Sequence, residues 1–181
     1  MSQPQERVLT QVAFVVEDIE STIHHWIDVM GIGPWQWMEN IPLREVTYRG
    51  QPAELELSAA VAFSGSVQIE LITQHNDGPS AYRDVVRDGS NGFHHICVFP
   101  KDYDAEVARY EKMGCEMATG GVVDASDLRF CYMDARDKLN CMVEIVDNPA
   151  GHLVVWADLI KATEEWDGKT DPIRRIPLGA I

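Results

Sequence analysis

The sequence predicts an α+β fold in which two tandem β-α-β-β-β modules form a curved, half-barrel mixed sheet around a central cleft, with the helices outside. The first observation is a repeat: the segment that begins at Gln11 recurs 84 residues later at His95. The second is that each copy continues into an amphipathic helix that ends at a glycine, Gly31 or Gly114. The third is that the two closing strands match. Internal repeats of this kind are a strong signal of fold.

Composition indicates one globular domain with its own core. The chain has 181 residues, of which 45% are hydrophobic, and a formal net charge of −14. This charge argues against nucleic acids and anionic membranes as partners. No apolar run approaches the roughly 20 residues of a membrane helix, and the polar segment 1–7 lacks a signal core, so we expect a cytoplasmic protein. Its four cysteines show no C-x-x-C spacing, which predicts buried free thiols.

The first module is expected to occupy about residues 8–75. Asp18 is a suitable N-cap for its helix, and Ser64-Gly65-Ser66 is a hairpin signal between its last two strands. The expected elements, in order, are a strand at 11–16, a helix at 18–30, an extended segment from Trp35, a loop at 41–53, strands at 54–63 and 67–73, and a short connecting helix at 79–86.

The second module is expected to occupy residues 92–147, with Asp102 as the N-cap of its helix. Its expected elements are a strand at 92–99, a helix at 102–113, a strand at 115–119, a turn at Gly120-Gly121, a strand at 128–134, a turn at 136–138 and a strand at 141–146. Residues 1–147 would therefore be one domain. Residues 148–181 would add a helix at 152–164 and a tail that packs on the domain or on a partner subunit.

Four polar residues occupy equivalent positions in the two modules. Gln11 and His95 open the repeated strands, while Glu70 and Glu144 lie at the same register of the closing strands. A lone buried carboxylate costs several kcal/mol, so each needs a partner or a metal ion. Pseudo-symmetry would bring all four residues together in the cleft. Because a strand alternates its faces, His95 would then point inward and His94 to the surface.

These four side chains offer three oxygen donors and one imidazole. Such a set suits a divalent ion such as Zn²⁺, Co²⁺, Ni²⁺ or Mn²⁺, whose charge the two glutamates would balance. An octahedral ion with four protein ligands keeps two positions open, enough to chelate a substrate through two oxygens. Iron-dependent ring cleavage is disfavoured, because it needs a second histidine ligand.

The repeated modules resemble the vicinal oxygen chelate superfamily, which includes glyoxalases, bleomycin-resistance proteins and dioxygenases. The resemblance covers residues 8–147, and its strand motifs are Val67-Gln-Ile-Glu-Leu71, Phe93-His-His-Ile96, Arg129-Phe-Cys-Tyr-Met-Asp134 and Val143-Glu-Ile145. It implies metal ligands at Gln11, Glu70, His95 and Glu144.

Within the superfamily, two branches are similar to this chain in different ways. The first ligand is usually His in the superfamily and is Gln here; the Gln-Glu-His-Glu set is similar to that of zinc-type glyoxalase I and departs from the methylmalonyl-CoA epimerase pattern, which has His first and usually Gln second. In contrast, Gly31-Ile-Gly-Pro34 and Gly78-Pro-Ser-Ala-Tyr-Arg83 look more like the methylmalonyl-CoA epimerase branch.

The expected function is that of a metal-dependent isomerase, epimerase or lyase acting on a small carbonyl compound. The metal would polarise the carbonyl and stabilise an enediolate, while a carboxylate removes and returns the neighbouring proton. Glu144 and Glu70 are the candidate bases. Glu56 is a third, because Glu54, Glu56 and Ser58 share one face of an expected strand.

Other functions stay open at this point. A metal-free protein of the bleomycin-resistance type, which binds or sequesters an apolar ligand, is favoured by Gln11 and by the tryptophans Trp35 and Trp37. A glutathione-dependent lyase is a weaker alternative, because no glutathione site can be located. Half-barrel sheets leave edges that a second subunit commonly covers, so a homodimer is expected.

Overall fold

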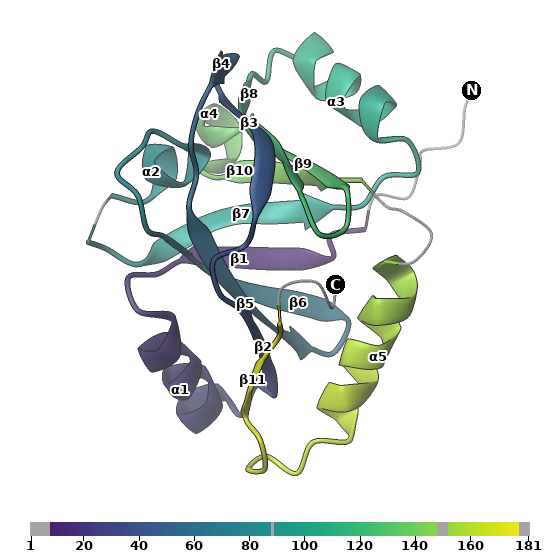
Figure 1. Ribbon diagram of the computed structural model, residues 1–181. Coiled ribbons are helices and arrows are strands. Elements are labelled where there is room, and N and C mark those ends of the chain that lie inside the picture. Colours follow the sequence, from purple (N-terminus) through teal and green to yellow (C-terminus); the bar gives the residue numbers. More distant parts are fainter. Residues whose placement is uncertain (1–7, 88, 148–151, 178–181) are drawn as a thin grey trace.

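The computed structural model describes residues 8–87, 89–147 and 152–177, and its strands form one curved, mixed sheet (Figure 1). Eleven strands follow the order β11-β2-β5-β6-β1-β7-β10-β9-β8-β3-β4. Their bounds are β1 Gln11–Val15, β2 Trp35–Met38, β3 Leu43–Tyr48, β4 Gln51–Pro52, β5 Leu57–Ser64, β6 Val67–Gln74, β7 Gly92–Val98, β8 Met117–Val123, β9 Leu128–Asp134, β10 Met142–Val146 and β11 Ile173–Arg175. The helices are α1 Ile19–Met30, α2 Ala81–Val85, α3 Tyr103–Lys112, α4 Arg136–Leu139 and α5 His152–Glu164.

The two predicted modules are confirmed as equivalent halves of this sheet. Strands β1 and β7 pair antiparallel at its centre, and each is flanked by the closing strand of its own module in parallel pairing, β6 beside β1 and β10 beside β7. The helices α1 and α3 flank the sheet (Figure 1). Asp18 and Asp102 cap them through their side chains, as predicted, because each carboxylate accepts an otherwise unpaired N–H of the first turn.

Apolar residues separate into clusters on the two faces of the sheet. Alternate residues of β6 show the pattern: Leu71 packs in the cluster under α1, whereas Ile72 packs in the cluster inside the curved sheet. On β10, Val143 and Ile145 join the cluster under α3, and Met142 and Val146 face inward. The polar residues that share the inward face of these strands are therefore held inside the sheet.

Residues 41–53, which were expected to form a loop, form strands β3 and β4 instead. Strand β3 pairs antiparallel with β8, which belongs to the other module. The segment between β2 and β3 is hydrogen-bonded to both modules. The Ile41 N–H donates to the Leu57 carbonyl of the first module, and the Asp124 N–H of the second module donates to the Pro42 carbonyl. The prediction was wrong because this pairing joins segments about 75 residues apart, which no local sequence pattern records.

The turn expected at Gly120-Gly121 is also wrong, because both glycines lie inside β8. Gly121 pairs with Phe130 on β9. A Cβ atom at Gly121 would lie 3.0 Å from the Phe130 ring and 3.3 Å from a methyl of Val46. The glycine is therefore explained by close packing between three strands and not by a turn.

The C-terminal segment packs on the domain itself. Helix α5 has the predicted bounds, and the Trp156 ring contacts the rings of Phe63 and Phe99, with centroids 5.0 and 5.1 Å apart. Strand β11 pairs in parallel with β2, so it covers that edge of the sheet. The ring of Trp166 lies where a side chain at Gly33 would be, with two ring carbons 2.8 Å from the position of a Cβ atom. Residues 148–151 and 178–181, also part of the predicted C-terminal segment, lie outside the described residues.

Two further predictions concern features of the whole chain. All four cysteines are free; Cys97, Cys131 and Cys141 are buried and Cys115 is half-buried. Among the described residues, no helix is long and apolar enough to cross a membrane.

Candidate metal centre

The four predicted residues converge on the inner face of the sheet. They come from four neighbouring strands at its centre: Glu70 from β6, Gln11 from β1, His95 from β7 and Glu144 from β10. The His95 Nε2 atom lies 3.2 Å from a Glu144 oxygen, 3.3 Å from Gln11 Oε1 and 3.5 Å from a Glu70 oxygen. His95 is fully buried, while the side chains of Glu70 and Glu144 are 16% and 10% exposed.

His94, which was expected at the surface, is instead fully buried beside His95. The pairing of β1 with β7 matches Ala13 to His95 and Phe14 to Phe93, so His94 has no partner on β1. This extra residue is a β-bulge, and a bulge interrupts the alternation of side chains between the two faces. The Nδ1 atoms of the two histidines lie 2.8 Å apart.

Gln11 is oriented by a second glutamine that the sequence analysis did not single out. Its amide nitrogen donates to Gln68 Oε1 at 2.6 Å, and both side chains are buried. Because the nitrogen is used in this way, the carbonyl oxygen of Gln11 is the atom turned toward His95. An amide can ligate a cation only through its oxygen, so Gln68 presents Gln11 in the orientation that a metal site requires.

Glu144 is surrounded by hydrogen-bond donors. Its register neighbours are Cys97 on β7 and Tyr132 on β9. Burial by itself would raise the pKa of Glu144, but the nearby His95 and hydrogen bonds from His95, Cys97 and Tyr132 hold this pKa below its usual value. The Tyr132 hydroxyl is also 2.8 Å from that of Tyr82. The protein therefore stabilises Glu144 as a carboxylate.

Glu70 lies at the same register in its own module but has different neighbours. Its partners on β1 and β5 are Ala13 and Val61, which have no side-chain donors. Burial, together with the negative charge of Glu144, raises the pKa of Glu70 well above its usual value. Two carboxyl groups whose environments push their pKa values apart are typical of sites that transfer protons.

The residues present fit a divalent cation. Donor atoms of Glu70, His95 and Glu144 all lie within 4.8 Å of one another, and Gln11 adds a fourth. The set combines one imidazole with three oxygens, which suits first-row divalent metals. A cation between Glu70 and Glu144 would offset both the burial and the mutual repulsion that raise the pKa of Glu70.

Some of the residues proposed from the sequence are not brought to this site. Glu56 is exposed and precedes β5; its carbonyl accepts the His75 N–H, and its N–H donates to Asn76. Trp35 and Trp37 belong to the apolar cluster under α1, outside the curved sheet, so they do not line its interior.

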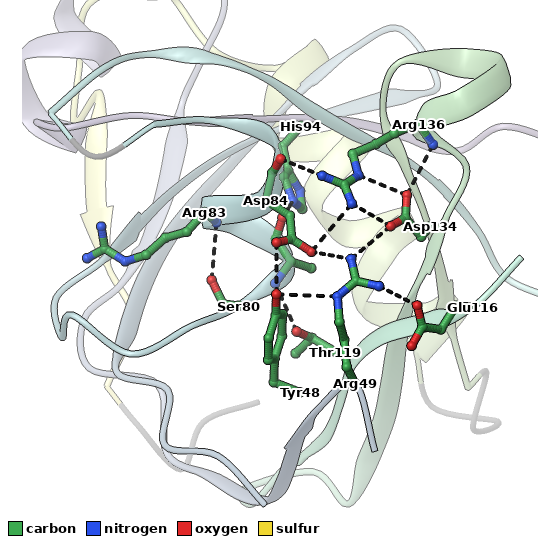
Figure 2. A network of polar contacts seen from close by, with 11 residues as sticks. Tyr48, Arg49, Ser80, Arg83, Asp84, His94, Glu116, Thr119, Asp134 and Arg136 are labelled. Carbon is green, nitrogen blue, oxygen red and sulfur yellow. Dashed lines mark hydrogen bonds and ion pairs between the residues drawn. The ribbon is translucent and has the colours of Figure 1, made fainter. Parts of the chain in front are cut away.

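Helix α2 contacts His94 through the Ala81 carbonyl, and an ionic network fixes this helix to the sheet (Figure 2). Asp84 accepts from the Tyr48 hydroxyl at 2.9 Å and from Arg49 at 2.6 Å. Arg136 donates to the Asp84 carbonyl at 2.7 Å and to Asp134 at 2.7 Å, and Arg49 also binds Asp134. These charges neutralise one another, which indicates a structural role.

Two comparisons extend the structural findings. In fold, the chain is similar to a hypothetical protein from Bacillus halodurans C-125, with a TM-score of 0.55 and 15% identity over 80% of this chain and 96% of that one. It is also similar to methylmalonyl-CoA epimerase from Mycobacterium tuberculosis, with a TM-score of 0.52 and 18% identity over 81% and 91% of the two chains. No curated protein matches the sequence.

The sequence itself carries a family match that agrees with this fold. The Glyoxalase/Bleomycin resistance protein/Dioxygenase superfamily matches residues 10–132, which is more than half of the chain. The matched range contains the two central strands, β1 and β7, and three of the four converging residues. The chain therefore belongs to the Glyoxalase/Bleomycin resistance protein/Dioxygenase superfamily.

Proposed function

We propose that this protein is a metal-dependent enzyme that moves a proton on a carbon next to a carbonyl group, as an isomerase, epimerase or lyase. The observation that carries the proposal is the convergence of Gln11, Glu70, His95 and Glu144 on one point inside the sheet. The epimerase fold of a structural neighbour is consistent with this chemistry.

Gln11, Glu70, His95 and Glu144 would hold the divalent ion, which is Zn²⁺, Co²⁺, Ni²⁺ or Mn²⁺ by the chemistry of the donors. When bound, the ion supplies a Lewis acid that polarises a carbonyl oxygen and favours loss of the neighbouring proton. Gln68 holds the Gln11 oxygen toward the site, while Tyr132 and Cys97 hold Glu144 in its ionised form.

Glu70 is the better candidate for the carboxylate that accepts the proton. Its side chain is the more exposed of the two, so a substrate reaches it more easily. It also lacks the hydroxyl and thiol contacts that hold Glu144, so it has fewer interactions to break when it moves. Glu144 would then stay fixed while Glu70 takes and returns the proton.

The test is a hydrogen-exchange screen. Small carbonyl acids, hydroxyketones and thioesters are incubated in D₂O with the protein loaded with each of the four metals, and ¹H NMR follows loss of the α-proton signal. We expect exchange with at least one compound class, abolished when the metal is chelated and restored when it is added back. Metal binding without exchange in any class would contradict the proposal.

The alternative is a metal-free binding protein. It is favoured by the contact between His95 and Glu144 at 3.2 Å, since a protonated His95 would satisfy this carboxylate without a metal. An apolar ligand that raises the melting temperature equally with and without chelator would support this alternative. A homodimer and a cytoplasmic location remain predictions, which size-exclusion chromatography with light scattering and cell fractionation would test.

A further inference from the structure

The feature that the proposed function does not use is the buried imidazole of His94. Its Nε2 atom lies 2.9 Å from the Ala81 carbonyl oxygen, and its Nδ1 atom lies 2.8 Å from Nδ1 of His95. The β-bulge of β7 is what turns both imidazoles to the same side. A bulge and two fully buried aromatic polar groups are costly to keep, so their arrangement calls for a physical explanation.

The positions of the protons on His94 and His95 follow from the contact between His94 and the Ala81 carbonyl. A carbonyl oxygen only accepts, so His94 must donate through Nε2–H to Ala81. The ring of His94 is fully buried, and a buried charge is costly, so we take the ring as neutral with this single proton. Its Nδ1 is therefore an acceptor, and the proton between the two rings belongs to Nδ1 of His95.

We infer that His94 is a positioning residue that keeps a proton on Nδ1 of His95, whether or not Nε2 also carries one, and thereby turns Nε2 toward Gln11, Glu70 and Glu144. The benefit of this arrangement for metal binding rests on the proposed function. A histidine that ligates through Nε2 needs its other nitrogen to donate to an acceptor, which fixes both tautomer and ring orientation. Here the acceptor is a second histidine, and not the carboxylate or carbonyl that commonly takes this role.

His94 is itself held from several sides. Its ring centroid lies 4.8 Å from that of Tyr82 and 5.3 Å from that of Tyr132, so it has little freedom to turn. The Ala81 carbonyl is fixed because the Ala81 N–H donates to Thr119 Oγ1 at 2.9 Å, and because the Asp84 network anchors the rest of α2 (Figure 2). The position of His95 Nε2 thus depends on α2, which lies on the far side of His94.

The experiment starts with metal-free protein labelled with ¹⁵N in its histidines. Long-range ¹H–¹⁵N correlation spectra identify which nitrogen of each ring carries a proton, and a coupling across the hydrogen bond between the two Nδ1 atoms reports the contact directly. We expect His95 to be protonated on Nδ1, His94 to be protonated on Nε2 alone, and the coupling to be present. A His95 ring protonated on Nε2 and not on Nδ1 would overturn the inference.

Two substitutions of similar size separate positioning from packing. In His94→Asn the side-chain oxygen can take the place of Nδ1 and accept from His95, whereas in His94→Gln the amide nitrogen can take the place of Nε2 and reach only Ala81. We expect Zn²⁺ affinity, measured by competition with a chromogenic chelator, to fall about 10- to 100-fold in His94→Gln. In His94→Asn it should stay within a few-fold of the wild type.

The controls keep this inference distinct from the proposed function. If both variants lose affinity equally and unfold at equally lowered temperatures, His94 acts through packing and the inference fails. If the wild type itself binds no Zn²⁺, the proposed function fails, and the NMR spectra of the metal-free protein still decide whether His94 fixes the tautomer of His95.

Discussion

Glu70 and Glu144 occupy equivalent positions in the two modules, yet their surroundings differ. Glu144 lies between Cys97 and Tyr132, and Glu70 lies between Ala13 and Val61. The first environment lowers the pKa of its carboxyl group, while the second raises it. The repeat of the module places two carboxyl groups next to each other in the cleft. The different residues on the neighbouring strands then give these two groups different pKa values.

The same contrast applies to the two residues that open the repeated strands. Gln11 is oriented by Gln68 from the adjacent strand, whereas His95 is oriented by His94 through a bulge that β1 lacks. The connecting helix α2 and its ionic network lie behind His94 and so support the second module's side of the site. The side chains of His95 and Glu144 therefore have more hydrogen-bond partners around them than the side chain of Glu70 has.

The largest effect is expected for a substitution of Glu70. In Glu70→Gln we expect the rate of α-proton exchange to fall by about 10²- to 10⁴-fold, because a general base contributes on that scale. The rate is measured by ¹H NMR in D₂O with the compound found in the screen, at saturating metal. Glu56→Gln serves as the matched control and should leave the rate nearly unchanged, since Glu56 is exposed. A larger loss in the control than in Glu70→Gln would reverse the assignment.

The next effect concerns the donors around Glu144. Tyr132→Phe removes a hydrogen bond that favours the carboxylate, so metal affinity should fall about 10- to 100-fold. The control is Tyr82→Phe, which removes the hydroxyl that contacts Tyr132 and keeps the ring, and its loss should be smaller. Chelator competition measures both. Equal affinities in the wild type and Tyr132→Phe would show that these donors do not prepare Glu144 for a metal.

The ionic network that fixes α2 to the sheet should contribute to the stability of the fold and not to the charge of the candidate metal centre. Arg136 and Arg49 hold the pKa of Asp134 far below its usual value against the opposing effect of burial. A lowered carboxyl pKa stabilises the fold above the unfolded value of about 3.9 and loses this contribution as pH falls. Asp134→Asn should therefore unfold about 1–3 kcal/mol more easily at pH 7.

The sign of this effect can be checked by urea unfolding across pH. The difference between wild type and Asp134→Asn should be constant above pH 5 and shrink as the pH falls through about 4 and below. A difference that grows toward acid pH would contradict the assignment of Asp134 as an ionised, paired carboxylate.

The smallest effect would make the two carboxyl groups more alike. Val61→Thr places a hydroxyl beside Glu70, at a position equivalent to that of Tyr132 beside Glu144. We expect the pKa of Glu70 to fall, because a donor favours the charged form. The measurement is a ¹³C NMR titration of labelled glutamate in the metal-free protein. Val61→Ala, which adds no donor, should leave the pKa of Glu70 raised.

The sequence was sufficient to predict the four converging residues because a repeat links positions far apart in the chain. The match of Gln11 with His95, and of Glu70 with Glu144, required only that both modules fold alike. Helix caps were equally predictable at Asp18, because capping is decided within a few residues.

What could not be predicted depends on register between distant strands. The bulge that buries His94 exists only in the pairing of β7 with β1, and a rule of strict alternation therefore placed His94 at the surface. Strand β3 gains its partner from the other module, and Gly121 is explained only by Phe130 across the sheet. The signal for His94 was present as two adjacent histidines, but a single sequence cannot show that a bulge will turn both inward.

The most direct test of the central claim is the metal content of the purified protein, measured by elemental analysis without added metal and again after loading with Zn²⁺, Co²⁺, Ni²⁺ or Mn²⁺. We expect close to one ion per chain in the wild type and little in His95→Ala or Glu144→Ala, with circular dichroism confirming that both variants fold. A wild type that holds no metal even after loading would contradict the account and favour the binding protein.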